Sequence, residues 1–446
     1  MKIIVSKFGG SSMKDHEAML RSAAISKRQN SFITLVSATY GTTDQLHLLI
    51  DYAVSQKWDE CEKLLFKIKE NHLNILSNLT DDHKTAQNLR ELLNNLETLT
   101  KGVFLIGECS LKIKDRVVSF GERLSSLLYT EAMKMTWPEK EITLIDSRNV
   151  LKTDSTFGKG APLVSEIKKQ CNATFDKSGK IAYVGQGYIG SDMNGSTTTL
   201  GRGGSDYSAA LFAEGVSADV LEIWTDVAGI ATTDPRIVAN ASPINEISYD
   251  EAGEMAQYGA KILHPTTLVP AMREKIPVFV GSSYESDEKG TWIHQEVKEK
   301  PLIRAITKRS NQALLTVRTP KMLDAFGFMS RIFNIFTKHK ISVDCITTSE
   351  ISVAVSVDQS TLDHKELIDE LSQIGSVATE TGLSLVSLIG NQMLHTPGLG
   401  KRLFTSIEEV NTRMVCFGAS PYNLNLLVKD EDSNLAISNL HKEFIG

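Results

Sequence analysis

Short apolar runs alternate with amphipathic segments over the first 283 residues of the chain. Runs rich in β-branched residues predict strands, and they lie at Lys2–Ser6, Phe32–Ser37, Ile142–Ile145, Ile181–Val184, Val220–Trp224 and Pro277–Val280. Apolar residues recur at three- and four-residue spacing elsewhere, which predicts helices at Asp59–Leu76, Ala86–Leu99 and Glu122–Met135. This alternation is typical of an α/β domain with a largely parallel sheet, whose ligands bind at the carboxyl ends of the strands.

The pattern changes after residue 283. The next stretch is charged and lacks apolar periodicity, which is typical of a linker. Beyond it the chain repeats itself, because a shift of 71 positions lays Gly327 on Gly398 and matches apolar positions on both sides. Each copy predicts the order strand, helix, strand, strand, helix, strand. We therefore expect an N-terminal α/β domain, a linker and two tandem α+β modules of βαββαβ type, at 1–283, 284–301, 302–376 and 383–446.

Composition and charge exclude several classes of protein. The 446 residues are 41% hydrophobic and 23% charged, with a formal net charge of −6, which argues against a nucleic-acid-binding protein. No apolar run approaches the roughly 18 residues that cross a bilayer, and no secretory leader opens the chain. We therefore expect a cytoplasmic protein without a membrane partner. The cysteines are scattered and form no C-x-x-C pair, so we expect reduced thiols and no metal site; they are Cys61, Cys109, Cys171, Cys345 and Cys416.

A glycine-rich loop at Leu200–Ser208 has the composition of an anion-binding site. Its glycines let backbone amides approach a charged oxygen, and Arg202 offers a planar fork to a carboxylate. The apolar run that follows predicts a helix, whose N-terminus adds to the attraction. The alternative is a plain surface turn capped by Ser205 or Asp206.

The N-terminal stretch Val5–Ser12 has the outline of a phosphate cradle. It places Lys7 at the end of a predicted strand, followed by Gly9, Gly10 and Ser11. Amides and hydroxyls donate to phosphate oxygens, and the ammonium group neutralises charge on a phosphoryl group in transfer. The sequence G-x-x-x-x-G-K-[ST] does not occur, which disfavours a P-loop kinase. The alternative is that Lys7 only caps the edge of the sheet.

Gly185–Gly190 matches the dinucleotide fingerprint G-x-G-x-x-G after a predicted strand. The fingerprint requires a helix next, whereas Ser191–Ser196 has the composition of a turn. We therefore reject dinucleotide binding and expect these glycines to let a loop lie against a ligand.

Three further segments carry charged residues beside predicted strand ends or helix starts. Ser119–Ser125 opens a helix with Glu122 in its first turn, where the alternative role is compensation of the helix dipole. Trp224–Arg236 ends a strand in a polar, arginine-bearing loop. Gly259–Pro265 offers a lysine just before a helix, and its histidine is more typical of capping or packing than of catalysis.

Five motifs in this order resemble those of aspartokinases, members of the amino-acid kinase family: K-F-G-G-S-S, F-G-E-R-L-S, T-L-G-R-G-G-S-D-Y-S, T-D-V-A-G-I with T-T-D-P-R, and G-A-K-I-L-H-P. The repeated modules resemble ACT domains, which bind small amino acids, and Ile341–Glu350 resembles the effector segment of the lysine-sensitive branch. The resemblance implies an amino-acid kinase fold, with a mainly parallel sheet between helices, and two ACT-like modules. The chain ends at Gly446, too early for the homoserine dehydrogenase of bifunctional forms, so we expect a monofunctional enzyme.

The resemblance implies an ATP-dependent phosphotransferase with a carboxyl acceptor. Aspartate kinases transfer the γ-phosphoryl group of ATP to the side-chain carboxylate of L-aspartate, giving 4-phospho-L-aspartate, the first step of lysine and diaminopimelate, threonine and methionine biosynthesis. By this resemblance Lys7 and Asp206 are catalytic, and the aspartate-binding residues are Thr43, Glu122, Arg202 and Ser205. The nucleotide-binding residues are Lys7, Gly9, Gly10, Ser11, Thr225, Asp226, Ala231, Arg236 and Lys261, with Mg²⁺ held mainly by the phosphates of ATP.

The resemblance also implies feedback inhibition by L-lysine through the ACT-like modules, which we expect to join two chains as a homodimer. Two positions depart from the family pattern. Ala325 replaces an expected serine at the effector site, which removes a hydrogen bond of about 1 kcal/mol, and Ala231 replaces a frequent aromatic residue near the nucleotide. Asp344 and Glu350 are able to pair a lysine ammonium, the alternative being two solvated surface acids. The residues that match the lysine-contacting pattern are Met322, Gly327, Phe328, Met329, Val343, Asp344, Ser349 and Glu350.

Two other functions stay open. A kinase for another acidic amino acid, such as glutamate, uses the same fold, although the Glu122 segment and the ACT-like modules weigh against it. A non-catalytic amino-acid sensor is disfavoured by the intact Lys7, Arg202, Asp206 and Lys261.

Overall fold

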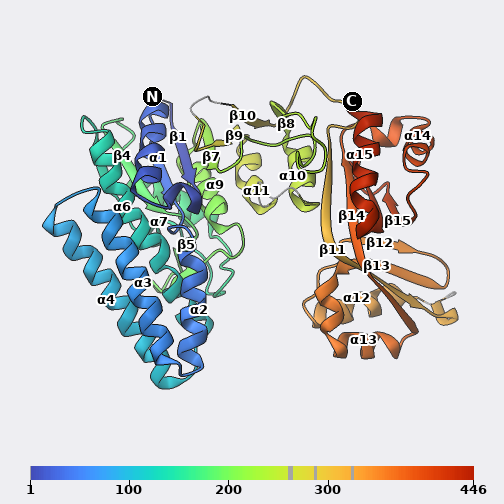
Figure 1. Cartoon of the computed structure of the whole chain (residues 1–446), viewed down its shortest axis with the longest axis horizontal. Helices are drawn as coiled ribbons and strands as arrows, with labels where there is room; N and C mark the ends of the chain where they lie inside the picture. Colours follow the sequence, from blue (N-terminus) through green and yellow to red (C-terminus); the bar gives the residue numbers. More distant parts are fainter. Residues whose placement is uncertain (1, 260–264, 286–288, 323–325) are drawn as a thin grey trace. The chain divides into compact units, whose positions relative to one another are not determined.

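The computed structural model describes residues 2–259, 265–285, 289–322 and 326–446 of the chain (Figure 1). None of the helices in these ranges has the length and hydropathy of a membrane span. Contacts between residues divide the chain into two compact units. Unit 1 comprises Met1–Ile230, Ile244–Tyr249 and Ile262–Glu296, and unit 2 comprises Ala231–Pro243, Asp250–Lys261 and Val297–Gly446.

Unit 1 is built on a sheet that has eight strands within the described residues, in the order β3-β4-β2-β1-β7-β9-β10-β8. Neighbours from β3 to β9 are parallel, β10 is antiparallel to β9, and β8 is parallel to β10. The strands are β1 (Ile4–Phe8), β2 (Ile33–Val36), β3 (Glu141–Leu144), β4 (Ile181–Gln186), β7 (Val220–Thr225), β8 (Glu246–Ser248), β9 (Val278–Ser282) and β10 (Gly290–His294). After β4, β5 (Ile189–Ser191) and β6 (Thr197–Thr199) form a separate hairpin.

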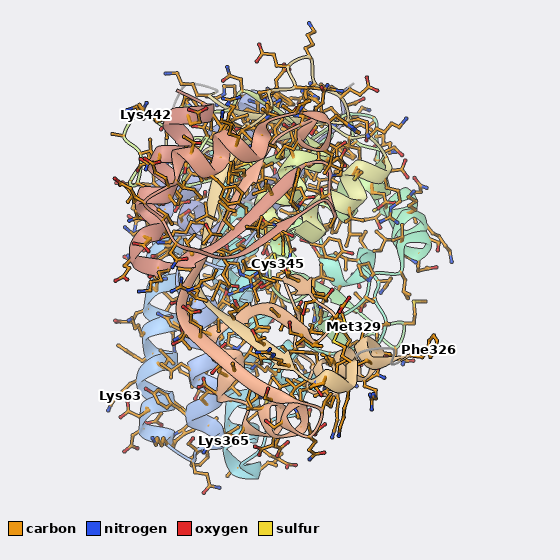
Figure 2. All side chains as sticks on the ribbon, turned by 90° about the vertical axis from the view of Figure 1, so that its right-hand side faces the viewer. Lys63, Phe326, Met329, Cys345, Lys365 and Lys442 are labelled. Carbon is orange, nitrogen blue, oxygen red and sulfur yellow. The ribbon has the colours of Figure 1, made fainter. Side chains whose placement is uncertain are left out.

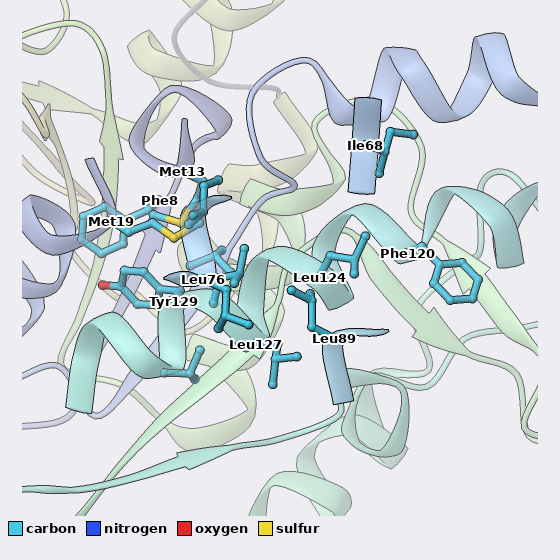
Figure 3. Close-up of a cluster of buried hydrophobic side chains, with 14 of the residues drawn as sticks. Phe8, Met13, Met19, Ile68, Leu76, Leu89, Phe120, Leu124, Leu127 and Tyr129 are labelled. Carbon is cyan, nitrogen blue, oxygen red and sulfur yellow. The ribbon is translucent and has the colours of Figure 1, made fainter. Parts of the chain in front are cut away.

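Helices cover both faces of this sheet. On one face α1 and α6 pack against the strands, with α2, α3 and α4 outside them, whereas α8, α9 and α11 cover the other face. The first face buries an apolar cluster that includes Phe8, Met19, Leu124 and Tyr129 (Figure 3). Burial of each such side chain contributes about 1.5–3 kcal/mol. The helices are α1 (His16–Gln29), α2 (Thr42–Val54), α3 (Trp58–Ser77), α4 (His83–Ile106), α5 (Leu111–Val118), α6 (Phe120–Thr136), α7 (Ser147–Val150), α8 (Val164–Thr174), α9 (Gly204–Val216) and α11 (Pro265–Arg273).

The strands and helices named from the apolar pattern are all present, and only their ends differ. β1 begins at Ile4 rather than Lys2, and it continues through Lys7 to Phe8 because both residues pair with β2 and β7. α4 is longer than predicted, since its buried positions continue to Val103. The amphipathic period therefore located each element, whereas tertiary pairing set its ends.

The linker expected at 284–301 contains a strand, β10. This strand pairs with β9 and buries Thr291 and Ile293, so unit 1 extends to Glu296 instead of ending at residue 283. β10 has only five residues, and its short alternation of apolar and polar positions gives a weak sequence signal next to the charged residues that precede it. Two short segments expected in the N-terminal domain, 231–243 and 250–261, belong to unit 2.

Unit 2 is an antiparallel sheet flanked by helices. Six strands of the described chain form it in the order β12-β13-β11-β14-β16-β15. The strands are β11 (Ala305–Arg318), β12 (Cys345–Thr348), β13 (Ser352–Asp358), β14 (Ser376–Ile389), β15 (Thr412–Phe417) and β16 (Asn423–Lys429). The helices are α10 (Tyr249–Gln257), α12 (Phe328–Lys338), α13 (Lys365–Ser372), α14 (Leu399–Ser406) and α15 (Ser433–Phe444).

The two repeated modules share their central strands. β11 and β14 pair along their whole length, with register shifts between Arg309 and Gln312 and between Gln312 and Leu314. The second half of β11 packs Leu315 against α12 and α13, whereas its first half packs Ile306 against α14 and α15. The two tandem modules therefore share strands, because the first half of β11 packs in the core of the second module. The 71-residue repeat predicts the order of the strands and helices along the chain. It does not predict that one long strand packs in two hydrophobic cores.

Candidate active site

Three loops meet at one edge of the unit 1 sheet, beyond the ends of β1, β2 and β7. They begin at Gly9, Ser37 and Asp226, directly after strands that pair in parallel. Carboxyl ends of parallel strands share one edge, and ligands of such sheets bind there. The glycine-rich loop before α9 joins this edge through Asp206. The structure thus brings together motifs that lie far apart in the sequence.

Lys7 and Asp206 form a close ion pair at this edge. The distance from Lys7 Nζ to Asp206 Oδ1 is 2.6 Å, and Lys7 is only 8% exposed. Asp206 lies in the first turn of α9, where the helix dipole favours a carboxylate. Gly9 passes so close that a Cβ there would lie 3.6 Å from Lys7 Nζ. The ammonium group is therefore held in place beside the backbone of the glycine loop.

Glu122 is a buried carboxylate whose hydrogen bonding is incomplete. It lies in the first turn of α6, is 3% exposed, and accepts a hydrogen bond through Oε1 from the Ala38 amide at 3.3 Å. Its Oε2 is buried and has no hydrogen-bond partner among the described residues. Burial raises the pKa of Glu122 to about 8, against the opposing effects of backbone amides and of the Lys7 charge. Compensation of the helix dipole at an exposed helix start does not explain why a carboxylate is buried with one oxygen unpartnered. A site for a bound cation does explain it.

The glycine-rich loop presents Arg202 to solvent. Gly201 and Gly203 have φ values of 76° and 71°, a left-handed backbone that favours glycine. Arg202, between them, is exposed and forms no ion pair within the described part of the chain. Ser205 and Thr43 are both half-buried, at the starts of α9 and α2. The structure therefore leaves these polar groups available to a ligand.

Asp115 supports the approach to this loop, and no sequence motif pointed to it. Its Oδ2 accepts hydrogen bonds from the amides of Gly158 at 2.8 Å and Thr199 at 3.0 Å, and its Oδ1 accepts one from Thr199 Oγ1 at 2.8 Å. Burial raises the pKa of Asp115, and these three donors oppose that shift. The contacts join segments far apart in the sequence, so no local pattern could have shown them.

The glycines of Gly185–Gly190 lead into the β5–β6 hairpin. The strand–turn–helix of a dinucleotide fingerprint is therefore not what this segment forms. A Cβ on Gly187 would lie 3.0 Å from the Cβ of Ser205, so glycine there lets the turn after β4 lie against the start of α9.

The phosphate cradle is held in place by hydrogen bonds to the two residues that follow β9. Gly10–Met13 forms a 3-10 helix, and the Ser12 and Ser283 hydroxyls are hydrogen-bonded at 2.7 Å. Tyr284 Oη donates to the Ser11 carbonyl at 3.0 Å, and Arg21 Nε donates to the Ser283 carbonyl at 2.8 Å. No local sequence pattern indicated this support, because only the folded sheet brings the partners together.

Outside the cradle and Lys7, the expected nucleotide-binding residues fall into three groups. Thr225 and Asp226 lie at the end of β7, level with the cradle, and Thr225 Oγ1 donates to Asp226 Oδ1 at 3.1 Å. Ala231 and Arg236 belong to unit 2, where Arg236 is 87% exposed along its side chain and pairs with Asp234 at 2.6 Å. Lys261, with the histidine that follows it in its motif, lies outside the described residues.

The expected effector residues lie in the first module of unit 2. Phe328 is buried in its core, and Met322, Met329 and Val343 pack against that core; Met329 is labelled in Figure 2. Gly327 precedes α12 with a φ of 74°. Ser349 Oγ and Ser352 Oγ are hydrogen-bonded at 2.6 Å. Ala325 lies outside the described residues.

Asp344 and Glu350 differ in burial. Glu350 is exposed, as expected of a solvated acid. Asp344 has a side chain that is 5% exposed and pairs with Arg309 at 2.8 Å, so it is not a surface acid. Burial raises the pKa of Asp344, and the Arg309 charge opposes the shift. Arg309 also pairs with Asp358 at 2.9 Å.

Comparison with known proteins places the chain in a family. Residues 2–282 match the amino acid kinase family, and residues 386–444 match the ACT domain. The chain is 41% identical over 451 residues to lysine-sensitive aspartokinase 3 of Escherichia coli (strain K12), which covers 99% of this chain and 98% of that protein. The chain is a member of the amino acid kinase family, in its aspartokinase branch.

Solved aspartokinases share the whole fold. The crystal structure of E. coli aspartokinase III in complex with aspartate and ADP (R-state) has a TM-score of 0.89 at 40% identity, covering 100% of both chains. The complex with lysine and aspartate (T-state) has a TM-score of 0.84 at 40% identity, with the same coverage. The aspartokinase motifs fall on the element ends described above: K-F-G-G-S-S ends β1, F-G-E-R-L-S starts α6, and L-G-R-G-G-S-D starts α9.

Proposed function

We propose that the edge of the unit 1 sheet transfers the γ-phosphoryl group of ATP to the side-chain carboxylate of L-aspartate, giving 4-phospho-L-aspartate. The observation that carries this proposal is the Lys7–Asp206 ion pair at the same edge as Glu122, a buried carboxylate with an unpartnered oxygen. The E. coli relative, which was crystallised with aspartate and ADP, supports the choice of substrates.

Electrostatics is the main obstacle to this reaction. The acceptor carboxylate, with an ordinary pKa of about 4, is already ionised at neutral pH and needs no general base. It must approach a phosphate, however, and two unit charges about 4 Å apart repel by roughly 4 kcal/mol at an effective dielectric of 20. Lys7 offsets this repulsion at the phosphoryl group in transfer. Asp206 holds the Lys7 ammonium in position, so it acts as a positioning residue.

Recognition of aspartate uses opposite charges at fixed positions. Glu122 receives the α-ammonium group of the substrate at its unpartnered Oε2, and Arg202 receives a carboxylate. Thr43 and Ser205 donate hydroxyl hydrogen bonds. A site with both a buried carboxylate and a guanidinium selects an amino acid over a simple dicarboxylate, which lacks the ammonium group.

The nucleotide occupies the cradle formed by Gly9, Gly10 and Ser11, beside Thr225 and Asp226. The resemblance to aspartokinases also assigns nucleotide-binding roles to Ala231, Arg236 and Lys261. By the resemblance to aspartokinases, Mg²⁺ would be held mainly by the phosphates of ATP. When bound, Mg²⁺ neutralises phosphate charge.

L-Lysine acts as a feedback inhibitor at the first module of unit 2, and the modules join two chains as a homodimer in the cytoplasm. The lysine sensitivity of the E. coli relative, and its structure with lysine and aspartate, support this assignment. Asp344 is the buried carboxylate able to receive the lysine ammonium, in exchange for its pairing with Arg309.

Formation of an acyl hydroxamate tests the function directly. The assay supplies ATP, Mg²⁺ and hydroxylamine with L-aspartate or L-glutamate, with and without millimolar L-lysine. We expect hydroxamate from aspartate only, suppressed by lysine. Product from glutamate would identify another acidic amino-acid kinase, and no product from either acceptor would favour a non-catalytic sensor. Activity that ignores lysine would remove the effector assignment and keep the kinase.

A further inference from the structure

His72 is a buried histidine in α3 that belongs to none of the sequence motifs. It has no exposed surface, and both of its ring nitrogens have partners. Nδ1 lies 2.7 Å from the carbonyl oxygen of Ile68, one turn earlier in the helix, and Nε2 lies 3.1 Å from Thr39 Oγ1. Ile68 itself packs in the apolar core (Figure 3). A buried imidazole therefore contacts the loop between β2 and α2, which contains Ala38 and leads into Thr43 at the start of α2.

The partners of His72 fix the direction of its hydrogen bonds. A carbonyl oxygen only accepts, so Nδ1 carries the proton and donates to Ile68. Burial lowers the pKa of His72 to about 4, so the ring is neutral at pH 7 and Nε2 is an acceptor. Thr39 must then donate its single hydroxyl proton to Nε2. Thr39 Oγ1 is consequently the acceptor for the Thr42 hydroxyl, which lies 2.6 Å away.

This directed chain joins the start of α2 to the preceding loop, at a helix start that has no side-chain cap. α2 begins at Thr42 after Gly41, which has a φ of 74° and no side chain to cap the helix. The Thr42 amide donates to the Thr39 carbonyl at 2.9 Å, so Thr39 and Thr42 are joined by backbone and by side chain. On one side of this pair the Ala38 amide donates to Glu122, and on the other side stands Thr43.

We propose that His72 is a positioning residue for aspartate binding: as a neutral acceptor it orders Thr39 and Thr42, and through them the segment 38–43 that contacts Glu122 and presents Thr43. The inference rests on the proposed function for its link to aspartate. The residue that would order this part of the aspartate site thus lies inside the helical layer, on α3, and not in the loops at the edge of the sheet. Lys7 and the phosphate cradle have partners of their own, Asp206 and Ser283, although Gly10 of the cradle also lies close to the Ala38 carbonyl. We therefore expect a larger effect on the acceptor substrate than on the nucleotide.

Steady-state kinetics on the full chain separates the roles. His72→Leu removes the acceptor and Thr39→Val removes the donor, and we expect each to raise the KM for aspartate about tenfold with kcat changed less than about threefold. The KM for ATP should change less than the KM for aspartate. The double variant should be no worse than either single one, because both break the same chain. His72→Gln, whose amide oxygen can accept from Thr39, and Thr39→Ser should restore a KM near that of the wild type.

A matched control distinguishes this role from simple core packing. Ile75→Val removes a methyl group from the same buried face of α3 and should lower Tm without changing the KM for aspartate. If His72→Leu and Thr39→Val act like this control, or raise both KM values together and add in the double variant, the positioning role is wrong.

Nuclear magnetic resonance provides a readout that does not depend on catalysis. The imidazole signals lost in His72→Gln should show a neutral ring protonated at Nδ1, and the Ala38 and Thr43 amide signals should shift in His72→Leu but not in Ile75→Val. A ring protonated at Nε2, or unshifted amides, would overturn the inference. An inactive wild-type protein with the expected signals would instead count against the proposed function while retaining the order of the loop.

Discussion

Glu122 in unit 1 and Asp344 in unit 2 are both buried carboxylates at candidate ligand sites, yet their surroundings differ. Asp344 forms an ion pair with Arg309 at 2.8 Å, whereas Glu122 forms none within the described residues and leaves Oε2 without a hydrogen bond. Burial raises the pKa of both groups, to about 8 for Glu122. At the proposed substrate site the buried carboxylate therefore lacks a cationic partner, whereas at the proposed effector site it already has one. Lysine binding there requires an exchange of partners, which is the kind of differential contact that links a ligand to a change of state.

The largest expected effect follows from removing the Lys7 ammonium group, which we propose stabilises the phosphoryl group during transfer. Lys7→Ala should lower kcat by roughly 10²–10³-fold, because it removes charge stabilisation at the group in transfer. The KM for aspartate should change far less. Initial rates at saturating aspartate and ATP test this. An equal rise of KM in Lys7→Ala and Arg202→Ala would contradict the division between catalysis and substrate binding.

Arg202→Ala should chiefly affect aspartate binding. We expect the KM for aspartate to rise by roughly 10–100-fold, since a charge-assisted pair contributes about 1.5–3 kcal/mol. The same titrations, with Arg202→Lys as the matched control that keeps the charge but loses the fork, measure how much of the effect depends on geometry. A fall in kcat with unchanged KM would place Arg202 at the transition state instead.

The raised pKa of Glu122 predicts a pH-dependent cost of folding. The ligand-free folded state keeps a proton that the unfolded state, with a pKa near 4.5, has already released. Wild type should therefore lose stability relative to Glu122→Gln as pH rises from about 4.5 to 8, by an amount on the order of a few kcal/mol. Urea unfolding at pH 5 and pH 8 measures this gap, and a gap that stays constant would contradict it.

Aspartate binding should also release protons. At pH 7 the free Glu122 is largely protonated, and pairing with the substrate ammonium requires the ionised form, so binding should release up to about one proton. Calorimetry in buffers of different ionisation enthalpy detects it. Glu122→Gln should bind aspartate weakly and without this release, and a release that persists in the variant would assign the proton to another group.

The smallest expected effect concerns Asp344. Asp344→Asn should raise the lysine concentration for half-inhibition about tenfold relative to wild type, each measured against its own uninhibited rate. Glu350→Gln is the comparison, since an exposed acid should contribute less than a buried one. Equal shifts in the two variants would show that burial of Asp344 does not matter to lysine.

Sequence patterns predicted much of this molecule, and the exceptions have a common cause. Lys7, Arg202 and Asp206 stand out because glycine and charge occur together at strand ends and helix starts. Ser283 and His72 carry no such local signal, since their partners lie on other elements. Asp344 pairs with Arg309, a residue of β11 that is distant in the sequence. The Oε2 atom of Glu122 is buried without a hydrogen-bond partner, which only the folded structure can reveal.

The shared strands β11 and β14 make the two ACT modules inseparable as parts. Excising residues 302–376 would remove the half of β11 that completes the core around Ile306, so the remaining module would expose its apolar face. A chimera that exchanges effector specificity must therefore transplant both modules as one cassette, from the start of β11 to the end of α15. In such a graft the splice points belong outside residues 305 and 444, where no strand is divided between two cores.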